Sequence, residues 1–126
     1  MAIEAIVSDK APAALGPYSA GTVAGSAIHV SGQLGILPDT GEFAGEDVRD
    51  QARQSLTNVR NILEAAGASM ADVAEATVLL ADIADFAAVN EVYGEFFSAP
   101  YPARAAFAVA GLPKGAKVEI KVVAYR

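Results

Sequence analysis

The segment 118–125 near the end of the chain alternates in a way that few folds accommodate. Side chains of a strand point alternately to the two faces of its sheet, so one face here carries Val118, Ile120, Val122 and Ala124, and the other carries Glu119, Lys121, Val123 and Tyr125. In segment 104–109 one face carries Ala105, Phe107 and Val109, and the other carries Ala106 and Ala108 with a single charged residue, Arg104. A sheet face open to water is normally more polar than this. The pattern therefore predicts a sheet that is covered on both faces.

Two helices are expected, and they can cover only one of those faces. The first spans residues 47–67, with Asp47 as N-cap, apolar residues at helical spacing and Gly67 as the residue that ends it. The second begins after Asp85, with Phe86, Val89, Tyr93, Phe96 and Phe97 on its buried side, and it stops before Pro100 and Pro102. A neighbouring subunit is the expected cover of the other face.

The remaining segments complete one domain over residues 1–126. Strands are expected at 2–7, 19–23, 27–31 and 73–81, with a hairpin turn at 24–26 between the second and the third. The order is βββαβαββ, which predicts an α+β sandwich with two helices on one face of a mixed sheet.

Composition restricts the chemistry. The chain is 53% hydrophobic and only 19% charged, with a net charge of −6, and this balance disfavours nucleic acid or an anionic membrane as partner. It has no cysteine and one histidine, His29, so thiol chemistry and clusters of several His or Cys metal ligands are excluded. No basic leader or long apolar stretch follows Met1, which favours the cytoplasm.

Arg104 and Glu119 are the strongest candidates for a site. The alternation places both on the face away from the helices, on strands expected to be adjacent. A buried arginine is costly unless it is paired, so Arg104 either forms an ion pair in a subunit interface or awaits a ligand carboxylate, and the sequence favours neither. Glu119 is a partner for that arginine, a general acid or base, or a solvated residue between two lysines.

Five other residues carry weaker signals. His29 lies within a strand and is interpreted as structural, because no second ligand or orienting motif accompanies it. Ser31-Gly32 ends that strand, where a glycine lets a backbone N–H approach an anion, although a turn glycine explains it equally well. Tyr18, after Gly16-Pro17, and Asn90, in the second helix, are weak candidates individually.

Several blocks taken together resemble a known family. They are residues 11–19 (APAALGPYS), 31–33 (SGQ), 51–59 (QARQSLTNV), 89–97 (VNEVYGEFF), 102–107 (PARAAF), 112–114 (LPK) and 118–120 (VEI). In this order they are similar to the Rid (reactive intermediate deaminase) family over essentially the whole chain. The resemblance implies a chorismate-mutase-like subunit in a homotrimer with a central barrel and clefts between subunits. It also implies hydrolysis of 2-imino acids, the tautomers of enamines such as 2-aminoacrylate and 2-aminocrotonate, to 2-keto acids and ammonia, with no cofactor.

The resemblance also assigns roles to residues. Arg104 would hold the substrate carboxylate, Glu119 would position water, and Tyr18, Ser31, Gly32 and Asn90 would line the cleft. Many members have Ser-Cys after the arginine where this chain has Ala105-Ala106, which changes the cleft wall at Ala106 and puts substrate range and rate in question. Two other readings stay open: a non-catalytic trimer that binds small carboxylates, and a ribonuclease or translation inhibitor, against which the net charge counts.

Overall fold

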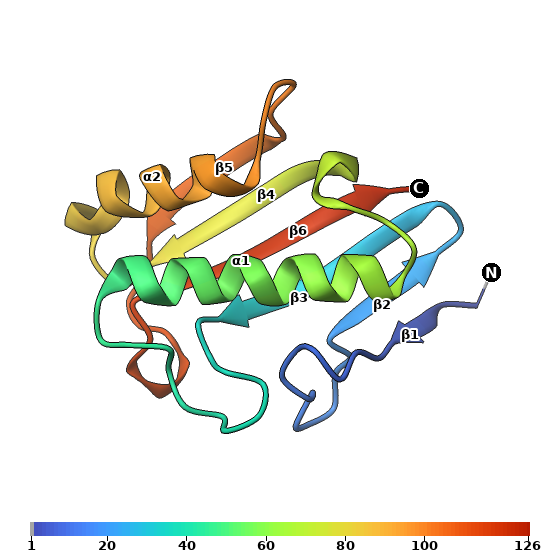
Figure 1. Ribbon diagram of the computed structural model, residues 1–126, viewed down its shortest axis with the longest axis horizontal. Coiled ribbons are helices and arrows are strands. Elements are labelled where there is room, and N and C mark those ends of the chain that lie inside the picture. The colour runs from blue at the N-terminus through green and yellow to red at the C-terminus, as the bar shows by residue number, and fades with distance from the viewer. Residues whose placement is uncertain (1) are drawn as a thin grey trace.

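A six-stranded mixed sheet with two helices on one face makes up the chain (Figure 1). The computed structural model describes residues 2–126. The strands are β1 (Glu4–Ile6), β2 (Gly21–Ala24), β3 (Ala27–Leu34), β4 (Val73–Leu80), β5 (Ala103–Ala108) and β6 (Val118–Tyr125). The predicted order of elements is confirmed, with three additional 3₁₀ turns at Met70–Asp72, Ile83–Asp85 and Pro113–Gly115.

The strand order across the sheet is β1-β2-β3-β6-β4-β5. Only β4 and β5 are parallel, and all other neighbours are antiparallel. The last strand in sequence therefore lies in the middle of the sheet, and β5 forms an edge. The expectation that the two C-terminal strands are adjacent is wrong, because β4 lies between β6 and β5.

Helix α1 (Val48–Ala65) begins and ends as the sequence predicts. The Asp47 side chain accepts a hydrogen bond from the Arg49 backbone N–H at 2.8 Å, and Gly67 adopts the positive φ of 78° that a residue after a helix often needs. Leu56, Ile62 and other apolar residues of its inner face are completely buried against the sheet. Because burial of one such side chain contributes about 1.5–3 kcal/mol, this face fixes the helix on the sheet.

Helix α2 (Phe86–Phe96) runs beside α1 and covers the β4–β5 end of the sheet. Val89 and Tyr93 are buried as expected, whereas Phe86 is 37% exposed and does not belong to the core. On the outer side of the helix pair, Arg49 and Arg53 of α1 form ion pairs with Glu91 and Glu95 of α2.

The core lies between the helices and one face of the sheet. From β6 this face contributes the predicted set Val118, Ile120, Val122 and Ala124, all at most 1% exposed. On the opposite face Phe107 is 46% and Tyr125 is 53% exposed. The chain itself therefore leaves that face open, and its cover by a second subunit stays a prediction.

A buried polar row on α1 holds the end of β3 in place. Ser55 donates to the carbonyl of Gln33 at 2.7 Å, and Asn58 donates to the carbonyls of Leu34 and Ile36 at 3.2 and 2.9 Å. Gly35 has no room for a side chain, because a Cβ there would overlap the α1 backbone. These contacts determine where β3 ends, and the candidate site begins at that point.

Candidate functional site

Arg104 lies on the edge strand β5 and its side chain packs under α2. Its Nη1 donates to Asn90 Oδ1 at 2.7 Å. The guanidinium carbon is 4.7 Å from the centre of the Tyr93 ring and 5.4 Å from that of Phe86, within the range of cation–π attraction. The guanidinium is thus held by an amide and two aromatic rings.

No carboxylate of residues 2–126 forms an ion pair with Arg104. A cavity of about 440 Å³ lies beside it, lined by Asn90, Tyr93, Gly94, Tyr101, Pro102 and Arg104. A guanidinium with unused N–H donors next to a cavity can accept a carboxylate through two parallel hydrogen bonds. The sequence left open whether Arg104 forms an ion pair or awaits a ligand carboxylate. Residues 2–126 supply no ion-pair partner for it.

Glu119 lies on β6, on the open face of the sheet. It is half-buried, and burial raises the pKa of its carboxyl group, an effect that the nearby charge of Lys121 partly offsets. A carboxylate whose pKa is raised by desolvation is a better proton acceptor than one in water, which suits a general base or a group that orients water.

Gly32 lies directly against Glu119. A Cβ at Gly32 would overlap the Glu119 carboxyl group, so only glycine allows this approach. The pairing of β3 with β6 shifts between Val30 and Gln33, and neither Ser31 nor Gly32 has a β6 partner. Such a bulge turns backbone groups away from the ladder and presents this glycine backbone beside the carboxylate.

Ser31 and Tyr18 complete this second group. The Ser31 hydroxyl donates to the carbonyl of Ser19 at 2.6 Å, so its proton is used within the chain and its oxygen remains an acceptor. Tyr18 is 57% exposed. Together with Gly32 and Glu119 they line a cavity of about 660 Å³ that also includes Lys114 and an apolar wall from the 12–15 loop.

The predicted site residues therefore form two separate groups in one chain. Arg104 pairs in register with Ala76 of β4, on the helix side, while Glu119 pairs with Leu79, on the open side. Two strand spacings across the sheet and three residues along it place the two Cα atoms about 14 Å apart. The prediction that both side chains share the helix-distal face is wrong, since Arg104 points toward α2.

Ala106 shares the face of Arg104, as the alternation predicts, and it is partly buried against the core. Sequence reasoning missed the contacts of Phe86 and Tyr93 with Arg104 and the position of Lys114. The spacing 86, 90, 93 places three side chains on one side of a helix, which is the signal that identifies the first two. Lys114 has a positive φ of 59°, which its sequence context does not reveal.

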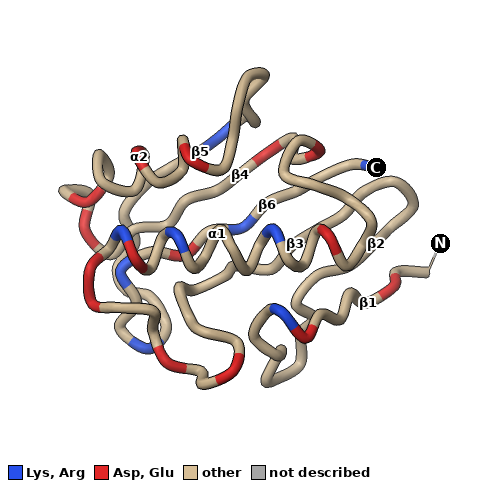
Figure 2. The backbone as a smooth tube through the Cα atoms, in the orientation of Figure 1, with Lys and Arg blue, Asp and Glu red and all other residues tan. Residues whose placement is uncertain are grey.

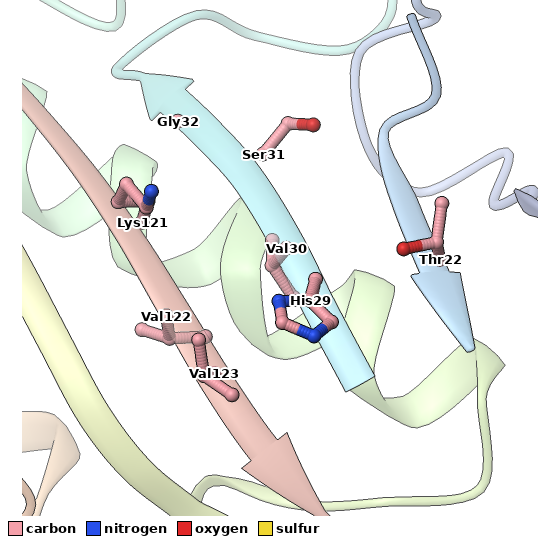
Figure 3. Close-up of a pocket in the computed structure, with 8 residues that line it drawn as sticks. All are labelled: Thr22, His29, Val30, Ser31, Gly32, Lys121, Val122 and Val123. Carbon is pink, nitrogen blue, oxygen red and sulfur yellow. The ribbon is translucent and has the colours of Figure 1, made fainter. Parts of the chain in front are cut away.

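His29 lies apart from both groups. Figure 3 shows it on the open face of β3, next to Thr22 of β2 and Val123 of β6. These residues line a shallow cavity of about 330 Å³. Within residues 2–126 no group of three or more His, Cys, Asp or Glu side chains is arranged to hold a metal ion, and no helix is both long and apolar enough to cross a membrane.

Comparison with known proteins gives consistent matches over the whole chain. The family model described as endoribonuclease L-PSP matches residues 8–126. A reactive intermediate deaminase A of Arabidopsis thaliana chloroplasts is 49% identical over 96% of the chain, which spans 65% of that protein, just under two thirds of its length. A 2-iminobutanoate/2-iminopropanoate deaminase of Capra hircus is 51% identical over 94% of the chain and 87% of its own length. The crystal structure of E. coli TdcF with bound serine has a TM-score of 0.93 at 47% identity and covers 98% of both chains.

Proposed function

This chain belongs to the Rid family, the group of proteins that the endoribonuclease L-PSP model describes, and from that premise we propose that it hydrolyses reactive 2-imino acids to 2-keto acids and ammonia. Relatives up to 51% identical are named 2-iminobutanoate/2-iminopropanoate deaminases, so the chain is an enzyme of this type, a hydrolase acting on C=N bonds. Its substrates would be small imines such as those formed from 2-aminoacrylate and 2-aminocrotonate, and its proposed location is the cytoplasm.

One observation carries the proposal: Arg104 borders a cavity and forms no ion pair within residues 2–126. A substrate carboxylate supplies the missing negative charge and thereby orients the adjacent C=N group. The serine bound in the E. coli relative is a small molecule with a carboxylate, which supports this class of ligand.

The reaction then needs little more than oriented water. Arg104 and the backbone N–H of Gly32 hold the carboxylate, and Glu119, with its raised pKa, accepts a hydrogen bond from the attacking water. Water adds to the imine carbon to give a carbinolamine. Proton transfer to the amine nitrogen lets ammonia leave, and the carbinolamine oxygen becomes the carbonyl of the keto acid.

Because Arg104 and Glu119 lie on opposite faces of one sheet, the proposed site needs two copies of the chain. The Arg104 cavity of one copy would meet the Tyr18, Ser31, Gly32 and Glu119 cavity of the next. A homotrimer with its barrel built from the open sheet faces would form three such sites and would also cover Phe107 and the other apolar residues of that face.

Ala105 and Ala106 replace the Ser-Cys pair of many relatives. Neither imine hydration nor carboxylate binding requires a thiol, so the proposed chemistry is retained. Ala106 is two residues from Arg104 on the same face and packs against the core. It is not among the residues that line the Arg104 cavity, so its effect there would be exerted through the packing next to Arg104. We expect the substrate range and the rate to reflect this difference.

The test is to generate 2-aminoacrylate in situ with a serine dehydratase and to measure the rate of pyruvate release with and without the protein. We expect the protein to accelerate release, and Glu119→Ala and Arg104→Ala each to abolish the acceleration while the fold is retained. If wild-type protein has no effect but still binds pyruvate, the non-catalytic carboxylate-binding reading replaces this one.

Cleavage of RNA is a second candidate, favoured by the family description as an endoribonuclease. Against it, the net charge is −6, and the basic residues are scattered over several elements among a larger number of acidic ones (Figure 2). A phosphate backbone is bound chiefly by clustered cations. Cleavage of a labelled single-stranded RNA by wild-type protein, lost in Glu119→Ala, would support this candidate.

A further inference from the structure

The side of α2 that faces β5 carries Phe86, Asn90 and Tyr93, and all three contact Arg104. We infer that these residues form an uncharged cradle, which positions the guanidinium without neutralising it, and that Asn90 is a positioning residue for Arg104 rather than a contact for substrate. This inference rests on the proposed role of Arg104 as the group that binds the substrate carboxylate.

The geometry of the cradle comes from the spacing along α2. Residues four and three positions apart lie above one another on a helix, so the amide of Asn90 stands between the two rings. It accepts from Nη1 at 2.7 Å, while the Tyr93 ring lies 4.7 Å from the guanidinium carbon. The flexible arginine side chain is thus held by one hydrogen bond and two ring contacts, which lowers the entropy lost when a ligand binds.

The cradle is neutral although α2 carries two glutamates. Glu91, next to Asn90, pairs with Arg49 at 3.0 Å, and Glu95 pairs with Arg53 at 2.9 Å. Both carboxylates are therefore directed to α1, on the far side of the helix from the guanidinium. An acid at position 90 would have the same shape as asparagine and would form an internal ion pair with Arg104, which an incoming carboxylate would have to displace.

Tyr93 supports this reading. It is 5% exposed and packs on Phe97 with ring centres 4.5 Å apart. Its hydroxyl is buried and has no hydrogen-bond partner within residues 2–126, and burial raises its pKa, an effect that the charge of Arg104 partly offsets. The part of Tyr93 that contacts the guanidinium is its ring face, 4.7 Å from the guanidinium carbon.

The experiment compares Asn90→Asp with Asn90→Ala. Kinetics with 2-aminoacrylate give kcat and KM, calorimetry gives the dissociation constant for pyruvate, and a thermal melt gives Tm. Asn90→Ala removes one hydrogen bond to a cation that water can solvate, so we expect KM and the dissociation constant to rise about 2- to 10-fold. Asn90→Asp adds a competing carboxylate, and we expect a rise of roughly 10- to 100-fold with Tm unchanged or higher. Asn61→Asp, the same amide-to-acid change on α1, controls for the added negative charge in the kinetics and the calorimetry, where it should match wild type. Its Tm should fall, because Asn61 donates to the Lys10 carbonyl at 2.8 Å and aspartate has no such donor.

The expected signature of Asn90→Asp is a loss of affinity for pyruvate with no loss of Tm. An asparagine with a purely structural role would lose both together. If Asn90→Asp binds pyruvate as well as Asn90→Ala does, or if its Tm falls in proportion to its loss of affinity, the inference is overturned. The two proposals fail separately. Without turnover by wild type, the deaminase proposal fails, but the calorimetric comparison of the two Asn90 variants still decides the role of the cradle.

Discussion

A mixed-oligomer experiment tests the two-copy site directly. Arg104→Ala and Glu119→Ala each remove one half of the proposed site, and each variant alone should lose at least about 10²-fold in kcat/KM. The two Cα atoms lie about 14 Å apart with the side chains on opposite faces, so one chain cannot bring both groups to one small substrate. Oligomers that contain both variants should therefore regain activity.

The size of the recovery follows from counting interfaces. Each site needs an intact Arg104 from one chain and an intact Glu119 from the next. In a random equal mixture each condition is met half of the time, so about a quarter of the sites should be complete, whatever the number of subunits in a closed ring. Two variants with different affinity tags, co-expressed and purified through both tags, provide mixed oligomers for the pyruvate-release assay. Because this purification removes the unmixed oligomers, the expected fraction rises to about one third for a trimer, in which every mixed ring has one complete site of three.

Activity of the mixed oligomers that stays at the level of the single variants would refute this reasoning. It would show that Arg104 and Glu119 act within one chain, through a rearrangement of the sheet. As the control, each variant is co-expressed with itself in the two tagged forms. These oligomers pass through the same purification and should remain inactive.

Three further outcomes follow from contacts described above. Glu119→Gln should lower kcat by roughly 10²–10⁴-fold, and wild-type kcat should fall as pH drops through the raised pKa of Glu119. The raised pKa also means that wild-type stability falls as pH rises through the same range, so the variant should have the higher Tm at neutral pH. Gly32→Ala should push the Glu119 carboxyl group aside and lower kcat by about 10²-fold with the fold retained, as measured by kinetics and circular dichroism. Asn58→Ala should leave two buried carbonyls without their donor and lower the unfolding free energy by about 2 kcal/mol in urea denaturation.

Much of the fold could be predicted from local patterns. The Asp47 cap, the apolar stripe of α1 and Gly67 together specify one helix, and the observed helix lies between the predicted Asp47 and Gly67. The alternation in 118–125 correctly separated core residues from residues of the open face. These signals are local, because each depends only on neighbours along the chain.

The position of Arg104 could not be predicted in the same way. Alternation shows which residues of one strand share a face, but not which face of a second strand corresponds to it. In β5 both sets are small or apolar apart from Arg104 itself, so neither set marks the core. The insertion of β4 between β5 and β6 depends on contacts distant in sequence. The resemblance named residues of both groups, but only the sheet order separates Arg104 and Asn90 from Glu119 and Gly32.

The ion pairs on the outside of the helix pair fix how α1 and α2 are aligned along their axes. Arg49 forms an ion pair with Glu91 and Arg53 with Glu95, so the two pairs are four residues apart on both parallel helices. A shift of α2 along its axis by one residue would separate both ion pairs, so the two pairs favour one position of α2 along α1. Each of these exposed ion pairs contributes at most about 1 kcal/mol to stability and is screened at molar salt. High salt therefore weakens the contact that fixes α2 along α1, while the buried residues Val89, Val92 and Tyr93 still hold the helix that carries Asn90 on the core.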